Sequence, residues 1–320
     1  MSMHAARLTG GVGRDGTVRA TPTAMPDPPA PPNVDYTAHV PHGALTPKAF
    51  GITDKGRVRP TNEDQFLVAE LSKAMRIRQT SLVEPKLHVG EERGHLYLVA
   101  DGMGGHRAGE TASALTVTAI EQFMLNSFKW FFAPDESGVQ KVLAEFQAAI
   151  GHADAHVMAE AAEHPELSGM GTTVTLAFHL GSQVCLVHVG DSRGYLYRDR
   201  ELQQVTHDHT LVADLVRRGE IQPEEVATHR YRHIITNVVG GPQVGVTVEA
   251  HAFEVKAGDR LLLCSDGLTE MLTNEAIAHV LGTTREPKEA ATALVAHAND
   301  AGGRDNVTVV VVHFDEASST

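Results

Sequence analysis

The chain has 320 residues, 42% of them hydrophobic and 21% charged, which is typical of a globular protein with a sizeable core. A formal net charge of −13 argues against a nucleic-acid-binding surface. The sequence contains neither an 18-residue apolar run nor a secretory signal, so we expect a cytoplasmic protein without a membrane-spanning segment. Cys185 and Cys264 each lie in an apolar, strand-like run and are expected to be reduced and buried.

The first 48 residues are predicted to form a disordered tail. The stretch TPTAMPDPPAPP (21–32) is rich in proline, and large apolar residues are scarce before Phe50. GVGRDG (11–16) fits the G-x-G-x-x-G pattern of dinucleotide sites, but it has no strand before it and no helix after it, so we reject that interpretation. The folded domain is expected over residues 49–315, followed by a short C-terminal tail, 316–320.

The first half of this domain is predicted to mix short strands with two long helices. The stretch Ser72–Gly94 shows no clear period and is interpreted as an inserted loop. The other expected elements are strands at Phe50–Thr53, Phe66–Glu70 and Leu96–Ala100, and helices at Ala108–Leu125 and Val139–Ala162.

After Gly169 the apolar period changes to two, which predicts consecutive antiparallel strands. His179 and His188 fall in these strands, where hydrogen-bonded sheet histidines are expected rather than ligands. Glu220–Gly241 is polar and rich in histidine and is predicted to form a mobile loop. The remaining expected elements are strands at 172–179, 183–189, 194–198, 202–205, 246–255, 260–264 and 307–314, and helices at 210–218, 274–281 and 287–298. This order favours a layered α+β fold over a doubly wound parallel sheet.

Four aspartates recur at the ends of apolar strands, next to Gly, Ser or Asn: Asp101, Asp191, Asp266 and Asp305. Asp64 is a fifth candidate. Each alone fits a turn or strand cap. Packed sheets would bring such strand ends to one rim, where clustered carboxylates would repel one another unless cations lay between them. Oxygen-only ligands favour magnesium or manganese over zinc.

Two such cations can share a bridging water and lower its pKa, which makes the water a nucleophile for in-line attack at phosphorus. Arg59, five residues before Asp64, is a candidate to bind the phosphate oxygens, although a solvated surface arginine is an equal alternative. The sequence contains no cysteine-phosphatase loop and no P-loop motif that would indicate another phosphate chemistry.

An ordered set of motifs carries a family resemblance. The set is RPTNED (59–64), VADGMGGHRAGE (99–110), GMGTT (169–173), HVGDSRGYLY (188–197), LLLCSDGLTE (261–270) and GGRDNVTVVVV (302–312). Together these motifs closely resemble the bacterial branch of the PPM/PP2C metal-dependent Ser/Thr protein phosphatases, over about Phe50–Phe314. The resemblance implies a four-layer αββα sandwich, with two antiparallel sheets between helices and the metals in the cleft between the sheets.

The resemblance also implies roles for individual residues. Asp101 would bridge two Mn²⁺ or Mg²⁺ ions, and Gly102 would offer its carbonyl to one of them. Asp266 and Asp305 would hold the other ion, and Asp191 would help to bind a weaker third. Asp64 would lie near the metals through water, and Arg59 would bind the phosphoryl group. The loop Glu220–Gly241 matches the family's flap, with His233 and Asn237 as candidate residues.

Two departures from the family pattern leave questions open. Met103 stands where many eukaryotic relatives have His, so the acid that protonates the leaving group is not assigned. A metal-bound water, Asp64, His106 and His233 are the alternatives. The 72–94 insert is longer than the usual family hairpin.

The predicted function is metal-dependent hydrolysis of phosphoserine and phosphothreonine in proteins, without a covalent intermediate. The expected partners are phosphorylated proteins that are targets of a Ser/Thr kinase, and the kinase itself. The alternatives are a catalytically silent phosphoprotein-binding pseudophosphatase and a phosphatase of a small phosphate ester.

Overall fold

The computed structural model describes residues 45–77, 79, 87–105, 107–126, 136–241 and 245–316, all within one compact unit, Val40–Thr320. The segments predicted to be tails therefore fall largely outside the described residues, as does His106. No helix among the described residues combines the length and the apolar character that a bilayer span requires.

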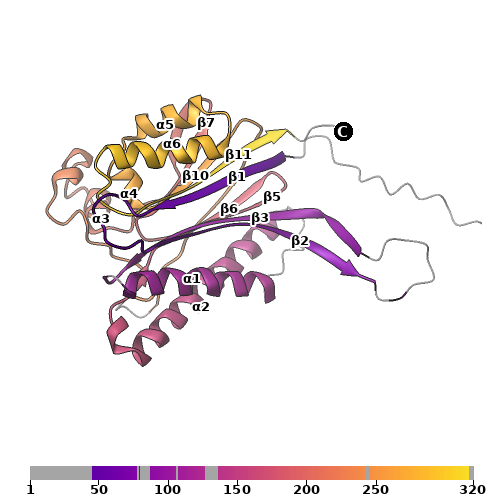
Figure 1. Ribbon diagram of the computed structural model, residues 1–320, viewed down its shortest axis with the longest axis horizontal. Coiled ribbons are helices and arrows are strands. Elements are labelled where there is room, and N and C mark those ends of the chain that lie inside the picture. Colours follow the sequence, from indigo (N-terminus) through magenta and orange to yellow (C-terminus); the bar gives the residue numbers. More distant parts are fainter. Residues whose placement is uncertain are drawn as a thin grey trace, which may run out of the picture. The chain divides into compact units, whose positions relative to one another are not determined.

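Two antiparallel sheets form the centre of the fold (Figure 1). The first sheet has the strand order β1-β11-β10-β7-β8, and the second has the order β2-β3-β5-β6-β9 with the short β4 paired to β3. Their bounds are β1 Leu45–Asp54, β2 Asp64–Arg76, β3 Leu87–Met103, β4 Gly171–Thr172, β5 Val174–Leu180, β6 Gln183–Val189, β7 Arg193–Arg198, β8 Glu201–Gln204, β9 Glu249–Glu254, β10 Arg260–Cys264 and β11 Val307–Glu316.

Helices cover the outer face of each sheet, which gives four layers (Figure 1). Helices α1 and α2 pack on the second sheet, and α5 and α6 pack on the first. The α-helices are α1 Arg107–Asn126, α2 Glu136–Glu163, α3 Leu211–Arg217, α4 Asp266–Thr269, α5 Asn274–Thr283 and α6 Pro287–Asp300. Two short 3-10 helices, η1 Pro165–Leu167 and η2 Pro223–Thr228, complete the set in the described residues. The predicted α+β αββα sandwich is confirmed.

Three apolar clusters hold the layers together, one in each interface. The central cluster joins the facing sides of the two sheets through fully buried side chains such as Val99, Leu186, Leu263 and Val310. Alternation along each strand sends every second side chain to this interface and the others to the helices. This explains why β11 reads as a continuous valine run: both faces of the strand are covered.

The interpretation of Ser72–Gly94 as a loop is wrong. Strands β2 and β3 continue through most of it as a long antiparallel hairpin, which projects past the neighbouring strands (Figure 1). The register shifts between Ser72 and Ala74, and this irregularity interrupts the period-two pattern from which a strand is recognised. Strand β1 also begins earlier than expected, at Leu45, so residues 45–48 belong to the first sheet rather than to the tail.

The strand register brings several chain segments to one end of the sandwich. Asp64, the first residue of β2, is directly opposite Asp101 near the end of β3. In the other sheet, β10 ends at Cys264 opposite Val309, which lies near the start of β11. Asp266 and Asp305 therefore emerge beside each other at the same end.

Candidate active site

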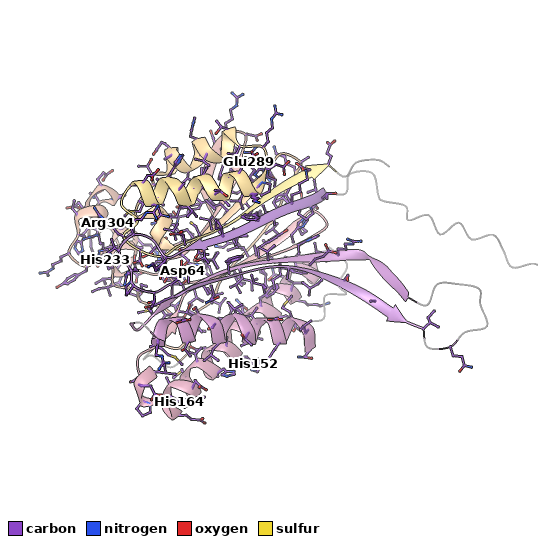
Figure 2. The ribbon with its side chains drawn as sticks, in the orientation of Figure 1. Asp64, His152, His164, His233, Glu289 and Arg304 are labelled. Atoms are coloured by element: carbon purple, nitrogen blue, oxygen red, sulfur yellow. The ribbon has the colours of Figure 1, made fainter. Side chains whose placement is uncertain are left out.

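A cleft of about 1520 Å³ opens at this end between the two sheets. Its lining includes seven of the predicted site residues: Arg59, Asp101, Gly102, Asp191, His233, Asp266 and Asp305. Asp64 is only 2% exposed and lies behind this lining, between the sheets, toward the end where His233 and Arg304 are found (Figure 2). The structure therefore brings together aspartates that are far apart in the sequence: Asp64 and Asp305, the first and last of them, are separated by 241 positions.

The GMGTT segment holds the backbone around Asp101. The Asp101 amide donates to Thr173 Oγ1 (3.0 Å), and the Asp101 carbonyl accepts from the Thr173 amide (2.9 Å) and from Thr172 Oγ1 (2.8 Å). Thr173 Oγ1 also lies 2.7 Å from Ser192 Oγ, which connects this strand end to the residue after Asp191. These buried hydrogen bonds fix where the Asp101 carboxylate leaves the strand.

Gly102 is required by close backbone packing. A Cβ at this position would collide with the carbonyl oxygens of Gly109 and Glu63. The Gly102 amide donates to the Glu63 carbonyl at 3.2 Å. The glycine therefore lets helix α1 and the RPTNED segment both approach the strand end.

Ser265 positions Asp64 from the opposite sheet. Its hydroxyl donates to Asp64 Oδ2 at 2.8 Å and accepts from the Thr308 amide at 2.9 Å. The other oxygen, Asp64 Oδ1, is buried without a hydrogen-bond partner, and so is Asp266 Oδ1. A buried carboxylate oxygen without a donor is energetically costly and indicates a missing positive partner.

Burial and mutual repulsion disfavour the charged forms of these carboxylates. Burial, with a contribution from Asp305, raises the pKa of Asp64 to about 6. Burial and then repulsion from Asp64 and Asp266 raise the pKa of Asp101 well above its ordinary value. Burial and repulsion from Asp191 also raise the pKa of Asp266. The pKa of Asp191 is itself raised to about 7 by burial and by repulsion from Asp208. Each carboxylate is thus destabilised as an anion by its surroundings.

Divalent cations fit this donor set. Positive charge between the aspartates would offset both the desolvation and the repulsion, and it would provide a partner for Asp64 Oδ1 and Asp266 Oδ1. The ligands are all oxygens, which is the set preferred by Mg²⁺ and Mn²⁺. Asp101, Asp191, Asp266 and Asp305, with the Gly102 carbonyl, are the residues available to hold such ions from the cleft side.

Arg59 is already engaged at the cleft. Its Nη2 donates to Asp305 Oδ2 at 2.5 Å, and the hydrogen bond raises the pKa of Arg59. The guanidinium therefore lies beside a predicted metal ligand, which is the place where a phosphate bound to the cations would meet it. Its side chain is half exposed, at 53%, so it can reorient toward a substrate.

The two flap candidates have different positions. His233 lines the cleft, and its Nδ1 lies 3.2 Å from Glu270 Oε1, just after α4. Asn237 is outside the cleft lining: its amide group bonds the Thr247 backbone at 2.7 and 3.1 Å and donates to His209 Nδ1 at 2.9 Å. Asn237 therefore anchors the end of the Glu220–Gly241 segment to the residues before β9. Met103 lies in the cleft wall and is 37% exposed.

The sequence analysis missed two organising residues. Asn306 donates to the carbonyls of Lys55 (2.9 Å) and Thr61 (2.8 Å) and accepts from the Glu63 amide (2.8 Å), so it fixes the RPTNED segment against β11. Arg193 forms a bidentate pair with Asp208, at 2.9 and 2.6 Å. Asn306 directly follows Asp305 in the sequence, and Arg193 lies two residues after Asp191. This proximity to predicted metal ligands is the sequence feature from which both could have been recognised.

Replacing Asn306 with Ala should lower the free energy of unfolding by about 2–4 kcal/mol, because three backbone groups lose their partner in a mostly buried setting. Urea unfolding would measure this. Asn274→Ala, at the exposed start of α5, is the matched control and should change the stability by less than about 0.5 kcal/mol. Equal stabilities for the two variants would contradict the role given to Asn306.

Comparison with known proteins gives a consistent result. The family model described as protein phosphatase 2C matches residues 75–296. Serine/threonine protein phosphatase PstP of Mycobacterium tuberculosis is 39% identical over 259 residues, 81% of this chain, and the chain spans 43% of that protein's length. Serine/threonine phosphatase stp of Listeria monocytogenes is 34% identical over 264 residues, which are 82% of this chain and 94% of the relative.

Solved structures agree with the sequence relatives. The crystal structure of M. tuberculosis PstP/Ppp superposes with a TM-score of 0.68 at 36% identity, covering 85% of this chain and 99% of that one. A structure of the PstP catalytic domain in complex with two manganese ions gives a TM-score of 0.65 at 36% identity, with the same coverage. By sequence, by fold and by the placement of its motifs, the chain belongs to the protein phosphatase 2C family.

Proposed function

We propose that the chain is a Mn²⁺- or Mg²⁺-dependent phosphatase that hydrolyses phosphoserine and phosphothreonine in proteins. The observation that carries the proposal is the convergence of Asp101, Asp191, Asp266 and Asp305 in the cleft lining, where Arg59 pairs with Asp305. The negative charge of Asp101 and Asp266 is strongly disfavoured there. The relatives named as Ser/Thr protein phosphatases support the substrate class.

In this proposal the aspartates bind the cations and Arg59 binds the phosphate. Asp101 and the Gly102 carbonyl, with Asp266 and Asp305, would hold two ions, and Asp191 would contribute to a weaker third. When bound, the ions would supply a water of lowered pKa as the nucleophile for direct attack at phosphorus, without a covalent enzyme intermediate. Arg59 would turn from Asp305 to two phosphate oxygens, since a guanidinium matches them bidentately.

Asp64 would act from behind the ions. Its carboxylate is held by a hydrogen bond from Ser265 to Oδ2, while Oδ1 has no hydrogen-bond partner and is available to a water bound by the ions. This keeps Asp64 in the proposal as a water-mediated neighbour of the ions and as one of the candidate acids for the leaving group. His233, at the cleft edge, is another candidate.

Phosphorylated proteins, the targets of a Ser/Thr kinase, are the proposed partners, and the kinase itself belongs to the same proposal. The open cleft, at about 1520 Å³, accommodates a polypeptide segment and favours a protein over a small phosphate ester. The complete set of aspartates favours an active enzyme over a silent phosphoprotein-binding protein.

The direct test is hydrolysis of a phosphothreonine peptide. Activity should require Mn²⁺ or Mg²⁺ and disappear with EDTA. Asp266→Asn should reduce kcat by about 100-fold or more, because the cations lose an anionic ligand. Asp300→Asn, at the exposed end of α6, is the control and should retain activity. A folded wild-type protein that binds phosphopeptide without hydrolysing it under any of these metals would support the silent-protein alternative instead.

Arg59→Ala should raise KM about tenfold and lower kcat by less, since phosphate binding by Arg59 acts on ground state and transition state alike. Arg304→Ala is the matched control, because Arg304 also lines the cleft but is exposed and precedes Asp305. Equal increases in KM for both variants would assign the effect to the net charge of the cleft and would contradict a phosphate-binding role for Arg59.

A further inference from the structure

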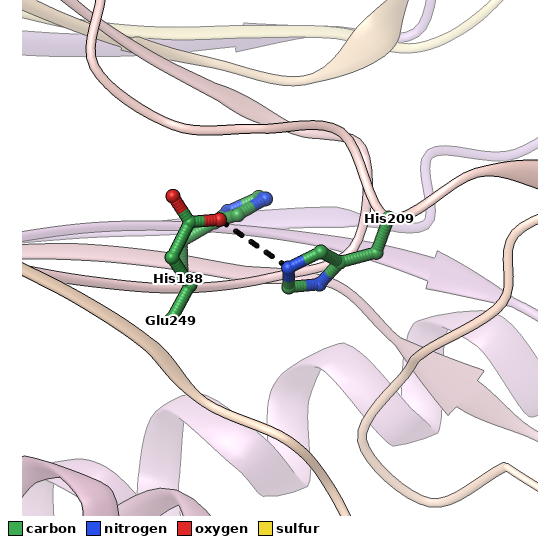
Figure 3. A group of neighbouring side chains, drawn as sticks. All are labelled: His188, His209 and Glu249. Atoms are coloured by element: carbon green, nitrogen blue, oxygen red, sulfur yellow. Dashed lines mark ion pairs between the residues drawn. The ribbon is translucent and has the colours of Figure 1, made fainter. Parts of the chain in front are cut away.

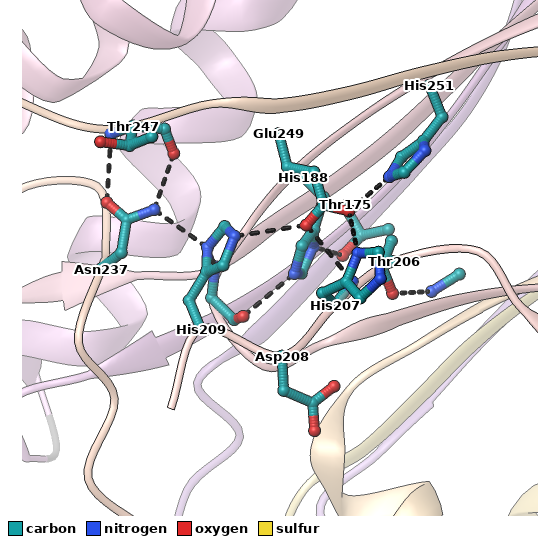
Figure 4. Close-up of polar contacts among 12 residues, drawn as sticks. Thr175, His188, Thr206, His207, Asp208, His209, Asn237, Thr247, Glu249 and His251 are labelled. Atoms are coloured by element: carbon teal, nitrogen blue, oxygen red, sulfur yellow. Dashed lines mark hydrogen bonds and ion pairs between the residues drawn. The ribbon is translucent and has the colours of Figure 1, made fainter. Parts of the chain in front are cut away.

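A group of histidines surrounds Glu249 at one edge of the sandwich (Figure 4), and one of them, His207, also lines the cleft. Glu249 and His251 lie two residues apart on β9, so their side chains project from the same face of the second sheet. His207 comes from the segment that follows β8, the edge strand of the first sheet. The group thus joins the edge strands of both sheets.

Two sets of three potential ligands occur in this group, each with its ligand atoms within 4.8 Å of one another. One set is His188, His209 and Glu249 (Figure 3). In this set His188 has no free ring nitrogen, because Nδ1 bonds Thr175 Oγ1 at 2.9 Å and Nε2 bonds the Gly190 carbonyl at 3.0 Å. His188 is therefore a hydrogen-bonded sheet histidine, as the sequence predicted, and this set does not suit a metal.

In the other set, His207, Glu249 and His251, the ligand nitrogen of each imidazole faces Glu249 and not a third group. His207 Nδ1 lies 2.8 Å from Glu249 Oε1, and His251 Nε2 contacts the same oxygen. The two imidazole rings have centroids 6.1 Å apart, on either side of the carboxylate. A cation that replaces the shared protons would receive two imidazole nitrogens and one carboxylate oxygen.

His209 orients the Glu249 carboxylate through its second oxygen, Oε2. Its Nδ1 accepts from the Gly190 amide at 3.0 Å and from Asn237 at 2.9 Å, so the proton is on Nε2, which faces Glu249 Oε2 at 3.3 Å. Hydrogen bonds from His209, His207 and His251 outweigh the effect of burial and lower the pKa of Glu249. The carboxylate is therefore oriented and anionic, as a metal ligand needs to be.

We propose that His207, Glu249 and His251 form a second metal site, one for a borderline transition-metal ion such as Zn²⁺. Two imidazoles and a carboxylate are a Zn²⁺ ligand set that leaves a fourth position open. His207 is 73% exposed, which gives the ion a path from solvent. The site differs in kind from the oxygen-only aspartate cleft, and its existence does not depend on the proposed catalytic function.

An ion at this site would link the segment after β8 to β9 and so connect the two sheets at their open edge. The linked segment also carries Asp208, the partner of Arg193, and His209, the neighbour of Gly190. Binding should therefore stabilise the fold by mass action, without direct contact with the aspartates.

The test is Zn²⁺ binding by the full chain in Mg²⁺ sufficient to saturate the aspartate cleft. Isothermal titration should show one further Zn²⁺ equivalent, and the unfolding temperature should rise with Zn²⁺. His207→Ala should weaken this binding at least about tenfold and remove the thermal shift, because one of three protein ligands is lost. His279→Ala, an exposed histidine on α5, is the matched control and should bind as the wild type does.

Further variants distinguish a loss of the metal site from a loss of the fold, and this site from the aspartate cleft. Because His207 is largely exposed, its variant should fold; His251→Gln and Glu249→Gln should reproduce the loss. Asp266→Asn should retain the Zn²⁺ equivalent, since that residue belongs to the other site. If His207→Ala binds Zn²⁺ with wild-type affinity and stoichiometry, or if Asp266→Asn abolishes all Zn²⁺ binding, the second site does not exist.

Discussion

The structure depends on one constraint: several buried carboxylates are held together at one end of the sandwich, where the hydrogen bonds and ion pairs of the described residues satisfy them only in part. Asp101 and Asp266 both have pKa values well above the ordinary one, and Asp64 and Asp266 each keep an oxygen without a donor. A fold accepts such a cost where another species compensates it. Strand pairing and the hydrogen bonds of the motif segments hold these carboxylates in place.

The placement of these groups follows from strand geometry. Antiparallel pairing puts Asp64 opposite Asp101, and the pairing of β10 with β11 puts Asp266 beside Asp305. The hydrogen bonds of Ser265 and Asn306 then connect segments that are far apart in the sequence. Packing of the central apolar cluster fixes the distance between the two sheets, so the rim keeps its shape.

The sequence was sufficient for the fold class and for the segments that form the cleft, because strand-ending aspartates with flanking glycines leave a strong local pattern. It failed at Ser72–Gly94, where a register shift disrupts the alternation that identifies a strand. It also could not reveal that Arg59 pairs with Asp305, that Asn237 bonds the Thr247 backbone, or that three histidines contact Glu249. These features arise from contacts between distant segments, which no local period records.

The central claim is that the rim aspartates hold two divalent cations. Diffraction from crystals grown with Mn²⁺, recorded at the manganese absorption edge, tests it most directly. The account predicts anomalous peaks in the cleft within ligand distance of Asp101, Asp266 and Asp305, with Arg59 displaced from Asp305. A cleft without manganese peaks, with the aspartates still buried and the ion pair between Arg59 and Asp305 intact, would contradict it.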